Sequence, residues 1–154
     1  MKVIFFLFLL AFVLALYLWS HKLRDSSSVG RIKSIKSTIG DQEFILDVAD
    51  TEQLRSYGLM NRIHLDSNAG MLFIFDMQGI YPFWMKNTLI PLDIIWLNSN
   101  KEVVYIKENA KPCGNLIEAL CKTIIPNKIA KYVVELNSGK TSELGLKIGD
   151  RIEF

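Results

Sequence analysis

The stretch Leu92–Ile106, LDIIWLNSNKEVVYI, decides the fold class of this chain. Its first six residues are almost wholly apolar, which is typical of a strand that is buried on both faces. Asn98–Lys101 (NSNK) consists of polar, turn-forming residues, and Glu102–Ile106 has the composition of a second strand. The sequence therefore predicts a β-hairpin within a sheet.

Other short strand patterns lie on both sides of this hairpin. We predict strands at Arg31–Ser37, Glu43–Val48, Met71–Phe75, Tyr81–Met85, Lys131–Leu136 and Arg151–Phe154. Two short helices are expected at Thr51–Tyr57, where Asp50 or Thr51 can cap the start and Gly58 can end the helix, and at Ser142–Leu146. Because strands do not alternate with long helices, we predict an α+β fold with a mostly antiparallel β-sheet curled into a small barrel or sandwich.

The N-terminus contains a membrane-directed segment. Val3–Trp19 is an unbroken apolar run of 17 residues after Lys2, which is just long enough to cross a hydrocarbon core. The residues after Ala15 form a poor signal-peptidase site, which favours an uncleaved transmembrane helix over a cleaved signal peptide. We predict an anchor or signal segment at residues 1–22, a polar serine-rich tether at 23–30 and one domain at 31–154.

Two cysteines indicate the compartment. Cys113 and Cys121 lie close together in a loop-like stretch and are the cysteines of the whole chain. Such a pair suits an oxidising environment, whereas the alternative is two unrelated buried thiols. We predict a disulfide, and we expect the domain on the extracytoplasmic side of the cytoplasmic membrane, with the lipid bilayer contacted by residues 3–19.

The charge balance argues against nucleic acid as a partner. The chain has 18 basic and 16 acidic residues, and Lys2, Lys22 and Arg24 belong to the leader, which leaves 15 basic and 16 acidic residues. The remaining basic residues are scattered, so few phosphate contacts could form.

The stretch from Arg55 to Asp93 places polar side chains among glycines, methionines and aromatic residues. We predict a ligand-binding cleft formed by Arg55, Arg62, Trp84, Lys86, Asn87 and Asp93. An aromatic floor with Arg, Lys, Asn and Asp on its rim suits a small polar ligand, either carbohydrate-like or anionic. The structural alternative is that Asp93 pairs with Arg55 or Arg62 inside the fold and that Trp84 is a core residue.

Catalytic and metal-binding alternatives have weaker support. Cys113 and His64 could form a thiolate pair, and Asp76 and Asp93 are nominal carboxylates for glycoside hydrolysis. Four methionines and one histidine invite a copper site: Met60, Met71, Met77, Met85 and His64. Methionines in apolar strands are more often core residues, so we predict no metal, no cofactor and no catalytic residues.

Several motifs of this chain are similar to those of a known family. They are RSYGLMNR (Arg55–Arg62), GMLFIF (Gly70–Phe75), FWMKNT (Phe83–Thr88), PLD (Pro91–Asp93), ENAKPC (Glu108–Cys113) and AKYVVELNSG (Ala130–Gly139). In order and spacing they resemble the domain of unknown function 192 family, from about Ile35 to the end of the chain. Ser138 replaces a common alanine, and the segment between the cysteines is less rich in proline than usual. The resemblance implies a compact β-rich domain, often exported or membrane-tethered, whose motif residues surround one cleft, and it implies no reaction.

The sequence thus predicts a membrane-tethered binding module for a small polar ligand. The alternative is an envelope accessory protein that docks a protein partner through the same surface. A second alternative is an enzyme acting on such a ligand.

Overall fold

The computed structural model describes residues 12–14, 17, 32–113 and 121–154. The chain divides into two compact units, residues 1–32 and 33–154. In the first unit, residues 12–14 and 17 are helical, whereas Ile32 has no regular secondary structure. Most of the predicted anchor and all of the predicted tether lie outside the described residues. Within the described part of the chain, no helix has both the length and the apolar character needed to cross a membrane.

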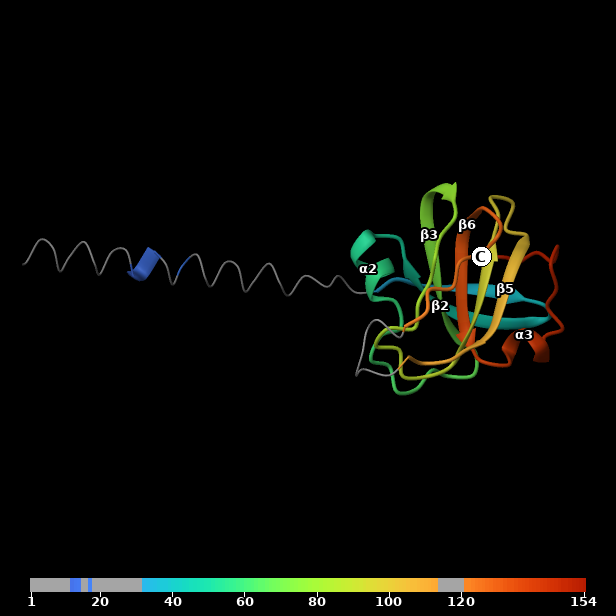
Figure 1. The fold of residues 1–154 in the computed structure, drawn as a ribbon, viewed down its shortest axis with the longest axis horizontal. Helices are drawn as coiled ribbons and strands as arrows, with labels where there is room; N and C mark the ends of the chain where they lie inside the picture. Colours follow the sequence, from blue (N-terminus) through green and yellow to red (C-terminus); the bar gives the residue numbers. More distant parts are fainter. Residues whose placement is uncertain (1–11, 15–16, 18–31, 114–120) are drawn as a thin grey trace, which may run out of the picture. The chain divides into compact units, whose positions relative to one another are not determined.

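Six strands of the second unit form one mixed sheet in the order β1-β2-β3-β6-β4-β5 (Figure 1). The strands are β1 (Ser34–Ile39), β2 (Gln42–Ala49), β3 (Ala69–Gly79), β4 (Leu92–Leu97), β5 (Val103–Ala110) and β6 (Ala130–Asn137). Four neighbouring pairs are antiparallel, which confirms the mostly antiparallel sheet, and β2 and β3 are parallel. The parallel pair requires a crossover, and residues 50–68, with helix α2 (Glu52–Tyr57), provide it.

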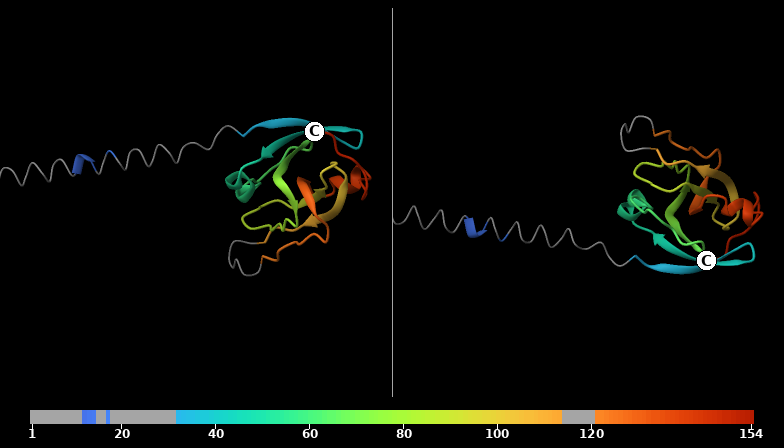
Figure 2. Two further views of the ribbon diagram at one scale, coloured as in Figure 1. Left: turned by 90° about the horizontal axis from the view of Figure 1, so that it is seen from above. Right: turned by 90° about the horizontal axis from the view of Figure 1, so that it is seen from below.

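The sheet is not closed into a barrel, and its six strands form one sheet rather than a sandwich of two, so that part of the prediction was wrong. β1 and β5 are the two edges of the sheet. The C-terminal segment forms isolated bridges to both sides, from Glu153 to Thr38 and from Arg151 to Glu102. Figure 2 shows this segment running between the two sides of the curved sheet. The predicted strand Arg151–Phe154 is therefore reduced to two isolated bridges. They pair backbone groups at the two edges of the sheet, but β1 and β5 do not pair with each other.

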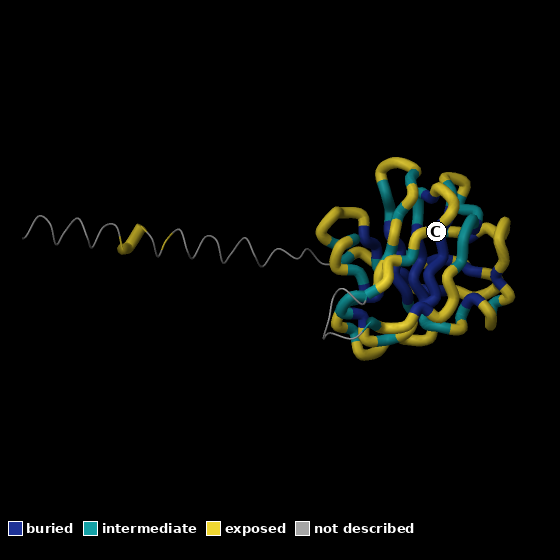
Figure 3. Tube along the Cα trace, viewed as in Figure 1, coloured by how far each residue is buried: buried dark blue, intermediate teal, exposed yellow. Residues whose placement is uncertain are grey.

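The predicted hairpin is confirmed. β4 and β5 are antiparallel neighbours, and all six residues of β4 are buried. β4 lies between β6 and β5, with one apolar core on each face of the sheet. The first core includes Met71, Phe73, Ile94, Trp96 and Val133, and the second includes Leu72, Ile95, Leu97, Val134 and Leu136. Figure 3 shows these buried strands at the centre, with the exposed turns around them.

The two short helices are both present. The Thr51 hydroxyl accepts a hydrogen bond from Leu54 N at 3.2 Å at the start of α2, and Gly58, with φ 51°, follows the helix as predicted. Helix α3 (Lys140–Glu143) begins earlier than the predicted Ser142–Leu146.

The predicted strand at Tyr81–Met85 is irregular. Its strand-like pairing is one bridge between Phe83 and Ile124. Pro82 within this segment has no backbone N–H, so a continuous ladder cannot form there.

The predicted disulfide is confirmed. Cys113 and Cys121 are bonded, with their Cα atoms 5.2 Å apart. This bond excludes the Cys113–His64 thiolate pair, because a disulfide sulfur is not a nucleophilic thiolate.

Candidate functional site

An open cleft lies between α2, β3 and the segment that follows β3. Its volume is about 340 Å³, and we name it the outer cleft. The lining residues are Glu52, Arg55 and Ser56 of α2, Phe73 and Phe75 of β3, and Pro82, Phe83 and Trp84. Its walls are mainly aromatic, and its polar groups come from one helix.

A smaller hollow adjoins the outer cleft. It has a volume of about 30 Å³, and we name it the inner recess. It shares Arg55, Ser56, Phe73, Phe83 and Trp84 with the outer cleft and adds Tyr57, Gly58, Leu59, Met60, Thr88 and Glu135. A space of this size holds about one or two water molecules or one small polar group.

Packing of aromatic rings holds the wall of the cleft. The ring of Phe83 meets those of Phe73 and Trp96 edge-on, with centroids 4.9 and 5.5 Å away. The Trp96 indole also donates a hydrogen bond to the Tyr81 carbonyl oxygen at 2.8 Å. Because Phe73 and Trp96 are buried in the first core, this wall is fixed before any ligand arrives.

Glu135 lies on β6, in the middle of the sheet. Its register partners are Met71 and Ile94, so its side chain lies on the same face as these two residues of the first core. The residue is 5% exposed, and its side chain forms no hydrogen bond or ion pair with any other described residue. The Glu135 oxygens keep some accessible surface, unlike the fully enclosed Ser37 Oγ, and Glu135 is one of the residues that line the inner recess.

Burial raises the pKa of the Glu135 carboxyl from an ordinary 4.5 to about 8. The cause is desolvation, which disfavours the charged form. At neutral pH this carboxyl is mostly protonated.

Arg55 lines both the outer cleft and the inner recess. Its Nη1 donates to the carbonyl oxygens of Asp50 and Ile74, both at 2.8 Å, and its guanidinium lies 5.2 Å from the centre of the Phe75 ring. These contacts hold the end of α2 against β3. The Nε and Nη2 donors form no hydrogen bond with the rest of the described chain.

Trp84 also lines both hollows, and it is 42% exposed rather than a core residue. The Lys86 ammonium lies 5.0 Å from the centre of its ring, while the backbone of Lys86 bridges to Cys113. Lys86 does not line either hollow. Of the six predicted site residues, the structure brings Arg55, Trp84 and Lys86 close to one surface.

Arg62 and Asn87 shape a loop rather than the cleft. Arg62 forms an ion pair with Asp47 at 2.6 Å. The Asn87 carbonyl accepts a hydrogen bond from Asn61 N at 2.8 Å, and both asparagines have positive φ, 54° and 61°. These contacts hold the loop that presents Met60 to the inner recess.

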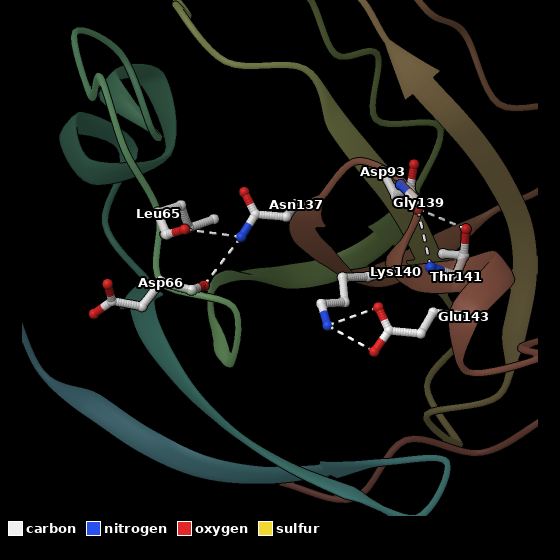
Figure 4. Close-up of polar contacts among 8 residues, drawn as sticks. All are labelled: Leu65, Asp66, Asp93, Asn137, Gly139, Lys140, Thr141 and Glu143. Atoms are coloured by element: carbon white, nitrogen blue, oxygen red, sulfur yellow. Dashed lines mark hydrogen bonds and ion pairs between the residues drawn. The ribbon is translucent and has the colours of Figure 1, made fainter.

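Asp93 lies on the opposite face of the sheet from Glu135, where it supports the fold. It lies beside Leu136 in the register, and it is fully buried. One carboxylate oxygen accepts from Asn109 N at 2.8 Å. The other accepts from Gly139 N, Thr141 N and the Thr141 hydroxyl at 3.0, 2.9 and 2.7 Å, and Figure 4 shows Asp93 beside Gly139 and Thr141. Neither predicted arginine partner contacts it. Asp93 instead fixes the start of α3, which explains why that helix begins before the predicted position.

The alternative catalytic and metal residues are separated. His64 is exposed and meets Asp66, Met77 is exposed, and Met71 and Met85 are buried in the first core. Asp76 is exposed, whereas Asp93 is enclosed by its four donors. Across residues 32–113 and 121–154, no group of three His, Cys, Asp or Glu side chains could hold a metal ion.

Glu135 is not one of the predicted site residues, although its signal is visible in the sequence. YVVEL (Tyr132–Leu136) has one acidic residue in a run that is otherwise apolar. A carboxyl in such a strand requires either a partner or a raised pKa. Sequence alone does not show which face of the sheet Glu135 occupies or what lies opposite it.

Residues 34–154 match the model of a family described as Uncharacterized ACR, DUF192. A UPF0127 protein of Pyrococcus furiosus is 38% identical over 89 residues, which cover 54% of this chain and 66% of that protein. A UPF0127 protein of Pyrococcus abyssi is 27% identical over 114 residues, which cover 71% of this chain and 85% of that protein.

Two crystal structures share the fold. A protein of unknown function from Novosphingobium aromaticivorans has a TM-score of 0.71 and 29% identity, over 82% of this chain and 89% of that one. A Sinorhizobium meliloti protein, provisionally named a transcription regulator, has a TM-score of 0.69 and 31% identity. The match covers 80% of this chain and 97% of that one. Residues 34–154, the region that matches the family model, contain every residue that lines the outer cleft and the inner recess.

Proposed function

Because this chain belongs to the uncharacterised DUF192 family, we propose that its β-rich domain is a binding module that takes a small polar ligand in the outer cleft. The observation that supports this most is the cleft itself, an open space of about 340 Å³ with fixed aromatic walls and polar groups from α2. Pockets with mostly apolar walls and a few polar groups are typical of small-ligand sites.

The lining residues suit a ligand with both a flat apolar surface and oxygen atoms. The half-exposed ring of Trp84 offers a face on which such a ligand can stack. Arg55 retains its Nε and Nη2 donors, which can grip ligand oxygens as a planar fork. Lys86, above the same ring, adds positive charge at the edge. We therefore assign ligand contact to Arg55 and Trp84, and a supporting charge beside the Trp84 ring to Lys86. Arg62 and Asn87 support the loop, and Asp93 supports the fold.

Membrane attachment is part of the same proposal. The apolar run at residues 3–19 would anchor the chain, and the Cys113–Cys121 disulfide supports an oxidising compartment for the domain. Trapping free thiols in cells before lysis tests this localisation. Recovery of both cysteines as reduced thiols would contradict it.

A thermal-shift screen of the full chain in nanodiscs against sugars, small carboxylates and phosphates tests the binding function. A ligand at one hundred times its dissociation constant adds about 2.7 kcal/mol to the free energy of unfolding. For a domain of this size, the melting temperature should rise by roughly 3 to 6 °C for each kcal/mol.

The matched controls are arginine variants. Arg55→Ala should abolish the shift of a hit, and Trp84→Ala should do the same. Arg151→Ala removes an equal charge at an exposed side chain that lines neither hollow and should leave ligand affinity unchanged. Equal loss of affinity in Arg55→Ala and Arg151→Ala would contradict the assignment of the outer cleft.

Exposed apolar side chains beside the cleft favour a second candidate, docking of an envelope protein. Tyr57 is 55% exposed and Trp84 is 42% exposed, and both line the inner recess. Aromatic residues of this kind are common anchors at protein interfaces. A photo-crosslinker at Tyr57 in native membranes should give one dominant adduct that Trp84→Ala removes. A smear of weak adducts would contradict a specific partner.

A further inference from the structure

Among the described residues, the carboxyl of Glu135 has no hydrogen-bond or ion-pair partner, and Glu135 lines a hollow of about 30 Å³. Buried acidic side chains are normally paired, because an isolated buried charge is costly. The side chain is 5% exposed, and its oxygens keep some accessible surface. The geometry therefore leaves room for one small polar group beside this carboxyl.

The surroundings of Glu135 are mainly apolar and aromatic. From the adjacent strands, its register partners are Met71 and Ile94. Phe73, Phe83 and Trp84 line the same hollow. Aromatic ring faces attract cations, so a recess lined by such residues suits a cationic group.

Of the charged side chains in residues 32–113 and 121–154, Arg55 is the one besides Glu135 that lines the recess. Its Nη1 is bonded to the carbonyl oxygens of Asp50 and Ile74, and its plane lies near Phe75. Within the described part of the chain, Arg55 forms no hydrogen bond or ion pair with Glu135. Among these residues the carboxyl therefore lacks a compensating cation.

We propose, building on the binding function above, that the inner recess receives the ammonium group of a small primary-amine ligand, which pairs with the carboxylate of Glu135 while the ligand's apolar part lies against Phe83 and Trp84. An ammonium group has three donors, and two residues that line the same hollow, Ser56 and Thr88, carry hydroxyls that can accept hydrogen bonds. Oxygen atoms elsewhere on the ligand would meet Arg55 in the outer cleft. A ligand carboxylate in the recess would instead face an acidic side chain.

The affinity of the inner recess for an amine ligand should depend on pH. Glu135 must lose its proton to pair with an ammonium group, so binding is weakened below its pKa of about 8. An alkyl amine with a pKa near that of lysine, about 10.4, stays charged throughout this range. The affinity should therefore be about 25-fold higher at pH 8.5 than at pH 6.5.

Three matched probes test the inference: 2-phenylethylamine, 2-phenylethanol and 3-phenylpropanoate. Each is titrated into the full chain in nanodiscs, and the ¹⁵N-labelled Trp84 indole and the ¹³C-labelled Glu135 carboxyl are followed by NMR. The amine should bind most tightly at pH 8.5 and should lower the pKa of Glu135. Glu135→Gln, which is nearly isosteric and neutral, should weaken amine binding at pH 8.5, remove its pH dependence and leave the alcohol unaffected.

The outcomes separate this inference from the binding function. If the alcohol binds as tightly as the amine at pH 8.5, or if Glu135→Gln leaves amine affinity unchanged, the ammonium assignment is overturned. In that case, loss of all binding in Trp84→Ala would still support the outer cleft as a ligand site. If no probe shifts the Trp84 signal, the ammonium assignment is overturned, and a thermal-shift screen without hits would overturn the binding function separately.

Discussion

Replacing Glu135 with glutamine should remove a large part of the pH dependence of this domain's stability. The carboxyl is buried on the face of the first core, and burial raises its pKa from 4.5 to about 8. Glutamine has nearly the same shape and cannot ionise. The substitution therefore isolates the cost of placing a charge at this position.

The sign and the size follow from proton linkage. Between pH 4.5 and 8 the folded chain keeps a proton on Glu135 that the unfolded chain releases, so the free energy of unfolding falls as the pH rises. The full contribution is present below about pH 4.5 and is lost by about pH 8. Each pH unit in this window changes the free energy by roughly 1 to 1.5 kcal/mol, which gives roughly 3 to 6 kcal/mol over the whole window.

Urea unfolding of the full chain in mild detergent, followed by tryptophan fluorescence at pH 5, 6, 7 and 8, measures this effect. Glu135→Gln should become more stable relative to the wild type at each step. Glu43→Gln, at a side chain that is 76% exposed, is the matched control and should run parallel to the wild type. A constant difference between Glu135→Gln and wild type from pH 5 to 8 would refute the reasoning.

Three other perturbations have expected outcomes. Asp93→Asn should lower the free energy of unfolding by roughly 3 to 5 kcal/mol in the same urea titration, because an amide cannot accept all four hydrogen bonds that this buried carboxylate accepts. The exposed control Asp76→Asn should change it by less than about 0.5 kcal/mol. Gly70→Ala should cost roughly 1 to 3 kcal/mol or prevent folding, since a Cβ there would lie 2.5 Å from a backbone oxygen of β6; an unchanged melting temperature would contradict the packing. Reduction of the Cys113–Cys121 disulfide should cost about 2 to 3 kcal/mol, seen as a lower melting temperature with dithiothreitol, and a Cys113→Ser/Cys121→Ser variant should show no further change with the reductant.

The sequence already determined the elements whose causes are local. The apolar side chains of a run such as LDIIWL are removed from water only when both faces of the strand are covered. β4 is accordingly buried at every residue. The cap at Thr51 and the stop at Gly58 depend on neighbouring backbone groups, so the bounds of α2 were predictable. The disulfide joins residues eight positions apart, and it was predictable for the same reason.

The elements that depended on distant parts of the chain were harder to predict. Four antiparallel pairs and one parallel pair give a mixed sheet, and β6 lies between β3 and β4, far from both in sequence. The start of α3 is set by Asp93, which is 48 residues away from Thr141. Such pairings depend on loop closure and on competing partners, which composition and periodicity do not record.

The candidate site divides along the same line. Sequence motifs located Arg55 and Trp84, because polar and exposed aromatic residues stand out in an apolar stretch. They also suggested Asp93, whose carboxylate instead accepts hydrogen bonds from backbone N–H groups on the other face of the sheet. Only the tertiary structure placed Glu135 beside the inner recess. The reason is that the solvent exposure and the neighbours of a strand side chain depend on the elements that pack over that face of the sheet.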